Sequence, residues 1–117
     1  MSLSWVRLDT AFPRNHKVLA LVGQRDGHRA LVTYICGLAY AGEQGTDGFI
    51  PKEALPLLHG RQAEATRLCG VRLWVPLPGG WMVNGWDEFQ PSTEEMKQRS
   101  IRARSAAMAR WHSDGDC

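Results

Sequence analysis

The chain has 117 residues, 44% of them hydrophobic and 22% charged, and a formal net charge of +2 at pH 7. This composition favours one globular domain, and so mild a basic excess is weak evidence for a nucleic-acid partner. The three cysteines, Cys36, Cys69 and Cys117, are too widely spaced for a disulfide framework or a zinc site. No stretch is long and apolar enough to span a membrane, and the N-terminus lacks a signal-peptide pattern. We therefore expect a cytoplasmic protein with reduced thiols.

The first elements are predicted as a short strand and a helix. Residues 4–8 (SWVRL) alternate loosely between polar and apolar types, which favours a strand. Asp9 and Thr10 offer capping oxygens, and Pro13 fits the first turn of a helix that ends near Gly23. The residues of this helix expected to face inward are Val18, Leu19, Leu21 and Val22.

A longer helix is predicted from Gly27 to about Gln44, at the centre of the domain. Its apolar residues recur at helical spacing over a broad face: Ala30, Leu31, Tyr34, Ile35, Leu38 and Ala39. Gly37 lies within this helix, where glycine costs about 1 kcal/mol relative to alanine. Close packing against a neighbouring element would explain its presence.

Two short helices are predicted after the turn at residues 45–48 and a very short strand at Phe49 and Ile50. The first runs from Pro51 to His59 and must be short, because Pro56 removes a backbone donor. The second follows Gly60 and covers residues 61–70, with Ala65, Leu68 and Cys69 as the candidates to face inward. Its side chains left for solvent or a partner are Arg61, Gln62, Glu64 and Arg67. Together they form the outline of a helix-turn-helix.

A β-hairpin is predicted next, with strands at residues 73–75 and 81–83 around the turn PLPGG. A helix pair followed by a hairpin is the order of elements in a winged helix. Trp74, Trp81 and Trp86 stand beside apolar strand residues, so we expect them to close the sheet side of the core, with one at the rim of the wing. Stacking on unpaired bases is the alternative.

The sequence changes character after residue 90. STEEMKQRSIRARSAAMARWH (residues 92–112) starts with a capping box and continues with basic residues and a weak apolar stripe, which predicts a basic helix. The predicted fold is therefore α+β and mainly helical, a winged helix-turn-helix with a small hairpin. Its parts are a winged-helix domain (1–90), a C-terminal basic helix (91–112) and a disordered tail (113–117).

The ordered set of motifs resembles a known family. WVRLDTAFPRNHKVLAL, GTDGFIPKEALPLL, the LW…GGW hairpin, GWDEFQPSTEE and a tail ending in ARWH together resemble the N-terminal winged-helix domains of replisome-organiser or replication-initiation proteins from actinobacterial phages and prophages. The resemblance covers residues 5–112 and implies DNA binding, or loading of replication proteins, in phage replication. Family members usually continue into a further C-terminal region, whereas this sequence stops shortly after ARWH.

If DNA is the ligand, the helix after Gly60 is the candidate for the major groove. Arginine pairs with guanine and glutamine with adenine through two hydrogen bonds each, so the candidate base readers are Arg61, Gln62 and Arg67. Thr66 is suited to a phosphate or a thymine methyl group. The candidate phosphate contacts are Lys52, Arg72, Lys97, Arg99, Arg102, Arg104 and Arg110. The alternative is a solvated helix face in which Glu64 is a local ion-pair partner.

A second class of function is a protein-interaction module with the same fold. The turn PLPGG carries no basic residue, and Trp111 is a natural anchor for a replication protein or for a second copy in a homodimer. No enzyme is indicated. The four histidines are scattered, and no phosphate-binding glycine loop or paired carboxylates are present, so we predict no catalytic residue, no metal and no cofactor.

Overall fold

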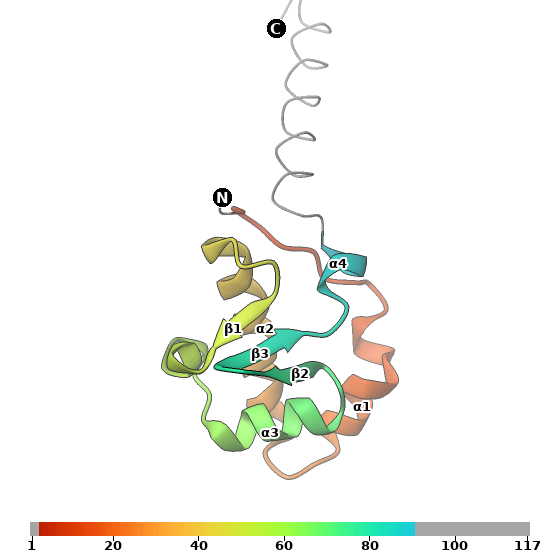
Figure 1. Cartoon of the computed structure of the whole chain (residues 1–117). Coiled ribbons are helices and arrows are strands. Elements are labelled where there is room, and N and C mark those ends of the chain that lie inside the picture. Colours follow the sequence, from red (N-terminus) through yellow and green to blue (C-terminus); the bar gives the residue numbers. More distant parts are fainter. Residues whose placement is uncertain (1–2, 91–117) are drawn as a thin grey trace, which may run out of the picture.

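A computed structural model describes residues 3–90 of the chain. Its elements are η1 (Phe12–Arg14), α1 (His16–Val22), α2 (Gly27–Gln44), β1 (Phe49–Pro51), η2 (Lys52–Leu58), α3 (Gln62–Gly70), β2 (Trp74–Leu77), β3 (Gly80–Val83) and α4 (Trp86–Phe89) (Figure 1). The described part is thus an α+β domain that combines helices with one small antiparallel sheet. The predicted basic helix and tail, with Lys97, Arg99, Arg102, Arg104, Arg110 and Trp111, lie outside the described residues.

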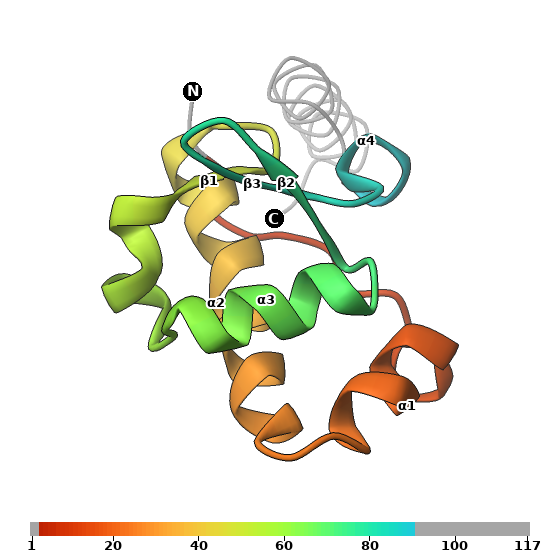
Figure 2. The same cartoon turned by 60° about the horizontal axis from the view of Figure 1, so that its bottom comes forward.

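The helix α2 is the element against which the others pack. Figure 2 shows α3 crossing it, and α1, η2 and β1 also contact it. Gly37 lies at the closest approach, because a Cβ there would lie 2.9 Å from Ile50 Cδ1 and 3.1 Å from Trp74 Cζ2. The prediction that Gly37 allows close packing of this helix against neighbouring elements is therefore confirmed.

The sheet has the strand order β1-β3-β2, and both pairings are antiparallel. Met82 lies opposite Phe49 on one side and opposite Val75 on the other. Side chains alternate between the two faces of a strand. The inner face therefore carries Ile50, Trp74, Trp81 and Val83, all buried, and the outer face carries the row Phe49, Met82 and Val75.

The predicted hairpin and the burial of its tryptophans are confirmed. Trp74 and Trp81 stack with ring centroids 5.4 Å apart, and Trp86 is buried beside them. The prediction that one of these tryptophans lies at the rim of the hairpin is wrong, since all three are in the core. The hairpin turn is also shorter than predicted, because the strands continue to Leu77 and start again at Gly80.

The predicted strand at residues 4–8 is wrong. This segment pairs with no strand; it crosses α2, where Leu3 N–H donates to the Gly42 carbonyl (2.8 Å) and Val6 packs against Gly42. Trp5 stays 52% exposed. Extended backbone with apolar residues can thus be held by a helix surface as well as by a sheet.

The predicted helices are present, with corrections to their inner faces. The helix ending near Gly23 is divided into η1 and α1, and Asn15 rather than Asp9 or Thr10 caps α1. Leu19 and Ile35 are exposed, and so is Ala39, because α1 and α2 bury narrower faces than predicted. The helix containing Pro56 is a 3-10 helix from Lys52 to Leu58, and a left-handed His59 ends it.

Candidate nucleic-acid interface

The exposed face of α3 carries the polar side chains predicted to read DNA. Gln62 and Thr66 are exposed and form a weak pair along the helix, Nε2 to Oγ1 at 3.4 Å. The Arg67 side chain is half-buried and folds back along α3, donating from Nη1 to the Ala63 carbonyl (3.3 Å). The opposite face, with Ala65 and Leu68, has no exposed surface. One side of α3 is thus fixed by the core and the other is open to a ligand.

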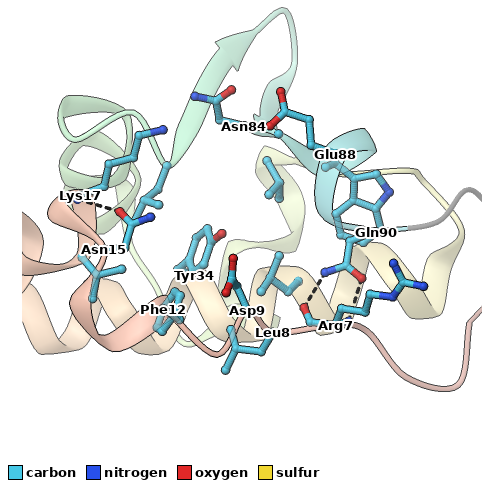
Figure 3. A pocket seen from close by; sticks show the side chains of 16 residues that line it. Arg7, Leu8, Asp9, Phe12, Asn15, Lys17, Tyr34, Asn84, Glu88 and Gln90 are labelled. Atoms are coloured by element: carbon cyan, nitrogen blue, oxygen red, sulfur yellow. Dashed lines mark hydrogen bonds between the residues drawn. The ribbon is translucent and has the colours of Figure 1, made fainter.

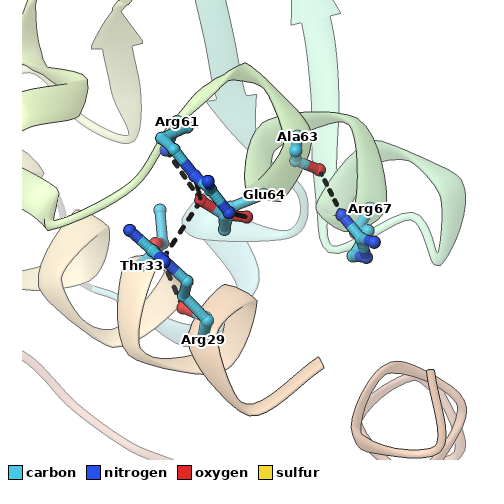
Figure 4. A network of polar contacts seen from close by, with 6 residues as sticks. All are labelled: Arg29, Thr33, Arg61, Ala63, Glu64 and Arg67. Carbon is cyan, nitrogen blue, oxygen red and sulfur yellow. Dashed lines mark hydrogen bonds and ion pairs between the residues drawn. The ribbon is translucent and has the colours of Figure 1, made fainter. Parts of the chain in front are cut away.

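Glu64 lies on the buried side, against the prediction that it remains for solvent or a partner. Its side chain has no exposed surface. Its carboxylate accepts hydrogen bonds from the backbone N–H of Arg61 (2.9 Å) and from Nε and Nη2 of the Arg61 side chain (3.1 and 3.3 Å) (Figure 4). Glu64 therefore satisfies the free N–H at the start of α3 and fixes the Arg61 side chain.

Arg29 of α2 joins this cluster, which sequence reasoning missed. Its Nε lies 3.5 Å from Glu64 Oε1, so one carboxylate faces two guanidinium groups (Figure 4). Both arginine side chains are more than half exposed, at 52% for Arg29 and 57% for Arg61. By formal charge these three side chains carry +1, and the carboxylate of Asp26, which also favours the charged form of Arg61, offsets this excess. No local sequence signal links positions 29 and 64, because only the packing of α3 on α2 brings them together.

The hydrogen bonds from Arg61 hold the pKa of Glu64 below its ordinary value. They outweigh the loss of hydration on burial, which acts in the opposite direction, and Arg29 adds a favourable charge. The same hydrogen bonds raise the pKa of Arg61. Both shifts favour the charged forms of Glu64 and Arg61, and the two guanidinium groups are more than half exposed beside the start of α3.

The turn before α3 is held against α2. A Cβ on Gly60 would lie 2.6 Å from both Cγ2 and Oγ1 of Thr33, whose side chain is fully buried. Thr33 Oγ1 donates to the Arg29 carbonyl (3.2 Å). The glycine that breaks the helix pair in the sequence therefore also allows close contact with α2, which sets the direction in which α3 leaves the turn.

Lys52 lies beside the tip of the hairpin. Its backbone N–H donates to the carbonyl of Gly79 (3.0 Å), and its side chain is exposed. The turn PLPGG has no basic residue of its own, but the pairing of β1 with β3 places one next to it. The sequence could not show this, because it depends on strand pairing between distant residues.

Arg72 stands at the other end of α3. Its φ of 65° places it in the left-handed region, and its carbonyl accepts from Lys17 Nζ (3.3 Å) and Asn84 Nδ2 (2.8 Å). These bonds fix the backbone between α3 and β2, and the Arg72 side chain is exposed. The predicted site residues within residues 3–90 thus lie at three places. Lys52 lies at the hairpin tip, Arg72 follows α3, and the α3 group consists of Arg61 just before the helix and Gln62, Thr66 and Arg67 on it.

Two further observations concern the described part alone. Residues 3–90 contain no cluster of histidine, cysteine and acidic side chains that could hold a metal ion. None of their helices has the length and hydropathy needed to cross a membrane.

Comparisons of the chain with protein families, with curated proteins and with solved structures found no match.

Proposed function

We propose that the chain is a DNA-binding module of the winged-helix type, with α3 as the helix that enters the major groove. The observation that carries the proposal is the polar face of α3, where Gln62 and Thr66 are exposed and Arg67 is half-buried, next to the half-exposed guanidinium groups of Arg29 and Arg61. The order of η2, α3 and then a hairpin is that of a winged helix, which supports the same reading.

The contacts divide the arginines into two roles. Arg61 already donates two side-chain hydrogen bonds to Glu64, so pairing with guanine would require it to give up bonds to a buried carboxylate. We therefore propose Arg61 and Arg29 as phosphate contacts, which position a protein without reading sequence. Gln62 and Arg67 make only weak contacts within α3 and are free to turn to base edges.

Lys52 and Arg72 flank this face in the proposal. Lys52 would contact a phosphate beside the hairpin tip, and Arg72 would contact one beyond the far end of α3. The basic residues after position 90 would extend the same electrostatic contact. A role in replication initiation, with replication proteins as partners, follows from the resemblance to phage replisome organisers and is part of the proposal.

The test is a fluorescence-anisotropy titration of the full chain with duplex and single-stranded DNA pools at low and physiological salt. Binding to duplex should fall steeply with salt, because contacts to several phosphates release counterions. After a site has been selected, Gln62→Ala with Arg67→Ala should weaken binding to it by roughly tenfold. The matched control is Arg14→Ala with Gln24→Ala, which removes an exposed arginine and an exposed glutamine outside α3.

Arg61→Ala is a poor first variant, because it leaves the buried Glu64 carboxylate without its main partner and combines a folding defect with a binding defect. Equal losses in the α3 double variant and in the control would remove α3 from the reading role. No salt-sensitive binding to duplex at low salt would refute DNA binding. Binding to single-stranded DNA alone would mean that DNA contacts surfaces other than α3.

A second candidate is a protein-interaction module, favoured by the outer face of the sheet. Val75 and Leu77 are each 39% exposed there, and Asp47, Asp87 and Glu88 line the same shallow hollow. Such a surface fits a partner that presents apolar side chains among basic ones. Binding of that partner should depend on Val75 and Leu77 and should be unaffected by Gln62→Ala with Arg67→Ala.

A further inference from the structure

A pocket of about 270 Å³ lies away from α3, between the N-terminal segment, α1, α2 and the base of the hairpin. Figure 3 shows its opening, with Lys17 on one side and Glu88 on the other. Pockets for drug-sized ligands usually measure about 300–1,000 Å³. The space therefore suits a ligand with one or two rings.

The floor of the pocket is apolar and aromatic. Phe12 and Tyr34 stack there, with ring centroids 5.8 Å apart and planes at 10°, and the remaining floor residues are Val18, Leu38, Leu73, Val83 and Trp86. Phe12 comes from the segment before α1 and Tyr34 from α2, so the stack joins two elements. Aromatic walls of this kind favour another ring in an offset or edge-on position.

Tyr34 supplies one free polar group at the floor. Within residues 3–90 its hydroxyl makes no hydrogen bond, although it lies at the pocket. Burial raises the pKa of this phenol, so the hydroxyl keeps its proton at neutral pH and can donate to an acceptor. A ligand with an oxygen near the ring would satisfy it.

The rim carries charges of both signs. Lys17 and Arg7 are basic, and Asp9 and Glu88 are acidic. Lys17 Nζ donates one hydrogen bond to the Arg72 carbonyl (3.3 Å), which leaves further N–H groups for a ligand. Among the described residues, Glu64 is the only acid in an ion pair, with Arg29 and Arg61, so none of the four rim charges is neutralised by such a contact. An occupant with separate positive and negative groups would complement this rim.

The wall formed by the N-terminal segment is held in place. The backbone N–H of Arg7 donates to Gln90 Oε1 (2.7 Å), and Gln90 Nε2 donates to the Arg7 carbonyl (2.6 Å). Gln90 is buried, so this amide joins segments 83 positions apart in the chain. The pocket is therefore built by tertiary contacts between segments that lie far apart in the chain.

We propose that this pocket binds a small aromatic zwitterion, of the chemical class of free aromatic amino acids. The ring lies on the floor formed by Phe12 and Tyr34, the carboxylate faces Lys17, and the ammonium group faces Glu88 and Asp9. The site does not include the proposed base readers of α3, but Lys17 at its rim donates to the carbonyl of Arg72, a proposed phosphate contact, so the two sites meet at that residue.

The test is a titration of the full chain with L-phenylalanine and L-tryptophan, followed by amide NMR shifts and by calorimetry. Saturable shifts should be confined to residues around the pocket. Phenethylamine, which lacks the carboxylate, and 3-phenylpropionate, which lacks the ammonium group, should each bind roughly tenfold more weakly.

Two charge variants make the test specific. Lys17→Met should weaken L-phenylalanine and 3-phenylpropionate but not phenethylamine. Glu88→Gln should weaken L-phenylalanine and phenethylamine but not 3-phenylpropionate. The matched controls are Lys52→Met and Glu53→Gln, which remove the same charges from η2, and amide spectra confirm that all four variants are folded.

The expected pattern is this crossed response. Three outcomes overturn the proposal: no saturable shift with either amino acid, equal binding of the zwitterion and its two analogues, or shifts centred on the outer face of the sheet. Equal effects of the pocket variants and the η2 variants would also overturn it, because binding would then follow net charge alone.

Discussion

The two outer surfaces of the domain, the face of α3 and the outer face of the sheet, differ in charge and in what supports them. The α3 face is polar, and a buried carboxylate from Glu64 fixes its start. The sheet face is apolar at Val75 and Leu77, and its hollow is lined by acids. A net charge of +2 is thus the sum over surfaces that differ in polarity and in charge.

The largest effect is expected where one buried group supports the α3 face. Glu64→Ala removes the carboxylate that accepts from Arg61 and faces Arg29, and should lower the free energy of unfolding by about 2–3 kcal/mol. Urea unfolding measures this loss. Thr66→Ala, two residues along and on the exposed side of α3, is the control and should change stability by less than about 0.5 kcal/mol. Equal losses in both variants would contradict the supporting role of Glu64.

The same carboxylate should make stability depend on pH. Because the pKa of Glu64 is lower in the folded chain than in the unfolded one, its contribution is fully present above the unfolded pKa of about 4.3 and is lost as the pH falls through the folded pKa. Glu64→Gln keeps an oxygen for the Arg61 backbone N–H but cannot titrate. Urea unfolding between neutral pH and pH 3 should therefore show the native chain losing more stability than the variant. Parallel curves would show that Glu64 does not control this dependence.

These effects mark the limit of prediction from sequence. Hydrophobic periodicity located α2 and α3, and the Gly-Gly turn located the hairpin, because each signal lies within one segment. The burial of Glu64 and the position of Lys52 escaped prediction, because Arg29 and Gly79 reach them only through tertiary packing. The strand predicted at residues 4–8 was wrong for the same reason. Alternation of polar and apolar residues does not determine whether the segment packs on a sheet or on a helix.

The sequence predicted which residues belong to the candidate site, and the structure corrected how they are arranged. Placing Gln62, Thr66 and Arg67 on an exposed helix face required only the helical period and the apolar positions Ala65 and Leu68. The role of Arg61 required knowing that its guanidinium already has a partner. The aromatic pocket was not predicted, because its walls come from segments that are far apart in the chain.

A smaller effect should separate the two surfaces in DNA binding. Asp47→Asn with Asp87→Asn removes two acids from the sheet face and should raise affinity for duplex DNA by only about twofold at physiological salt, because charges beyond about 8 Å are largely screened. Anisotropy titrations measure this beside the roughly tenfold loss expected for Gln62→Ala with Arg67→Ala. A rise as large as that loss would mean that DNA lies on the sheet side.

The smallest effect is expected from the apolar side chains of the sheet face. Val75→Thr with Leu77→Thr should change the free energy of unfolding by less than about 0.5 kcal/mol, because both side chains already contact water and threonine keeps the strand preference. Val83→Thr is the matched control on the inner face, where only 2% of the residue is exposed and a buried hydroxyl should cost about 1–3 kcal/mol. Thermal and urea unfolding distinguish the two. A large loss from the outer pair would mean that these residues are covered in the full chain, and the sheet face would then no longer be free for a partner.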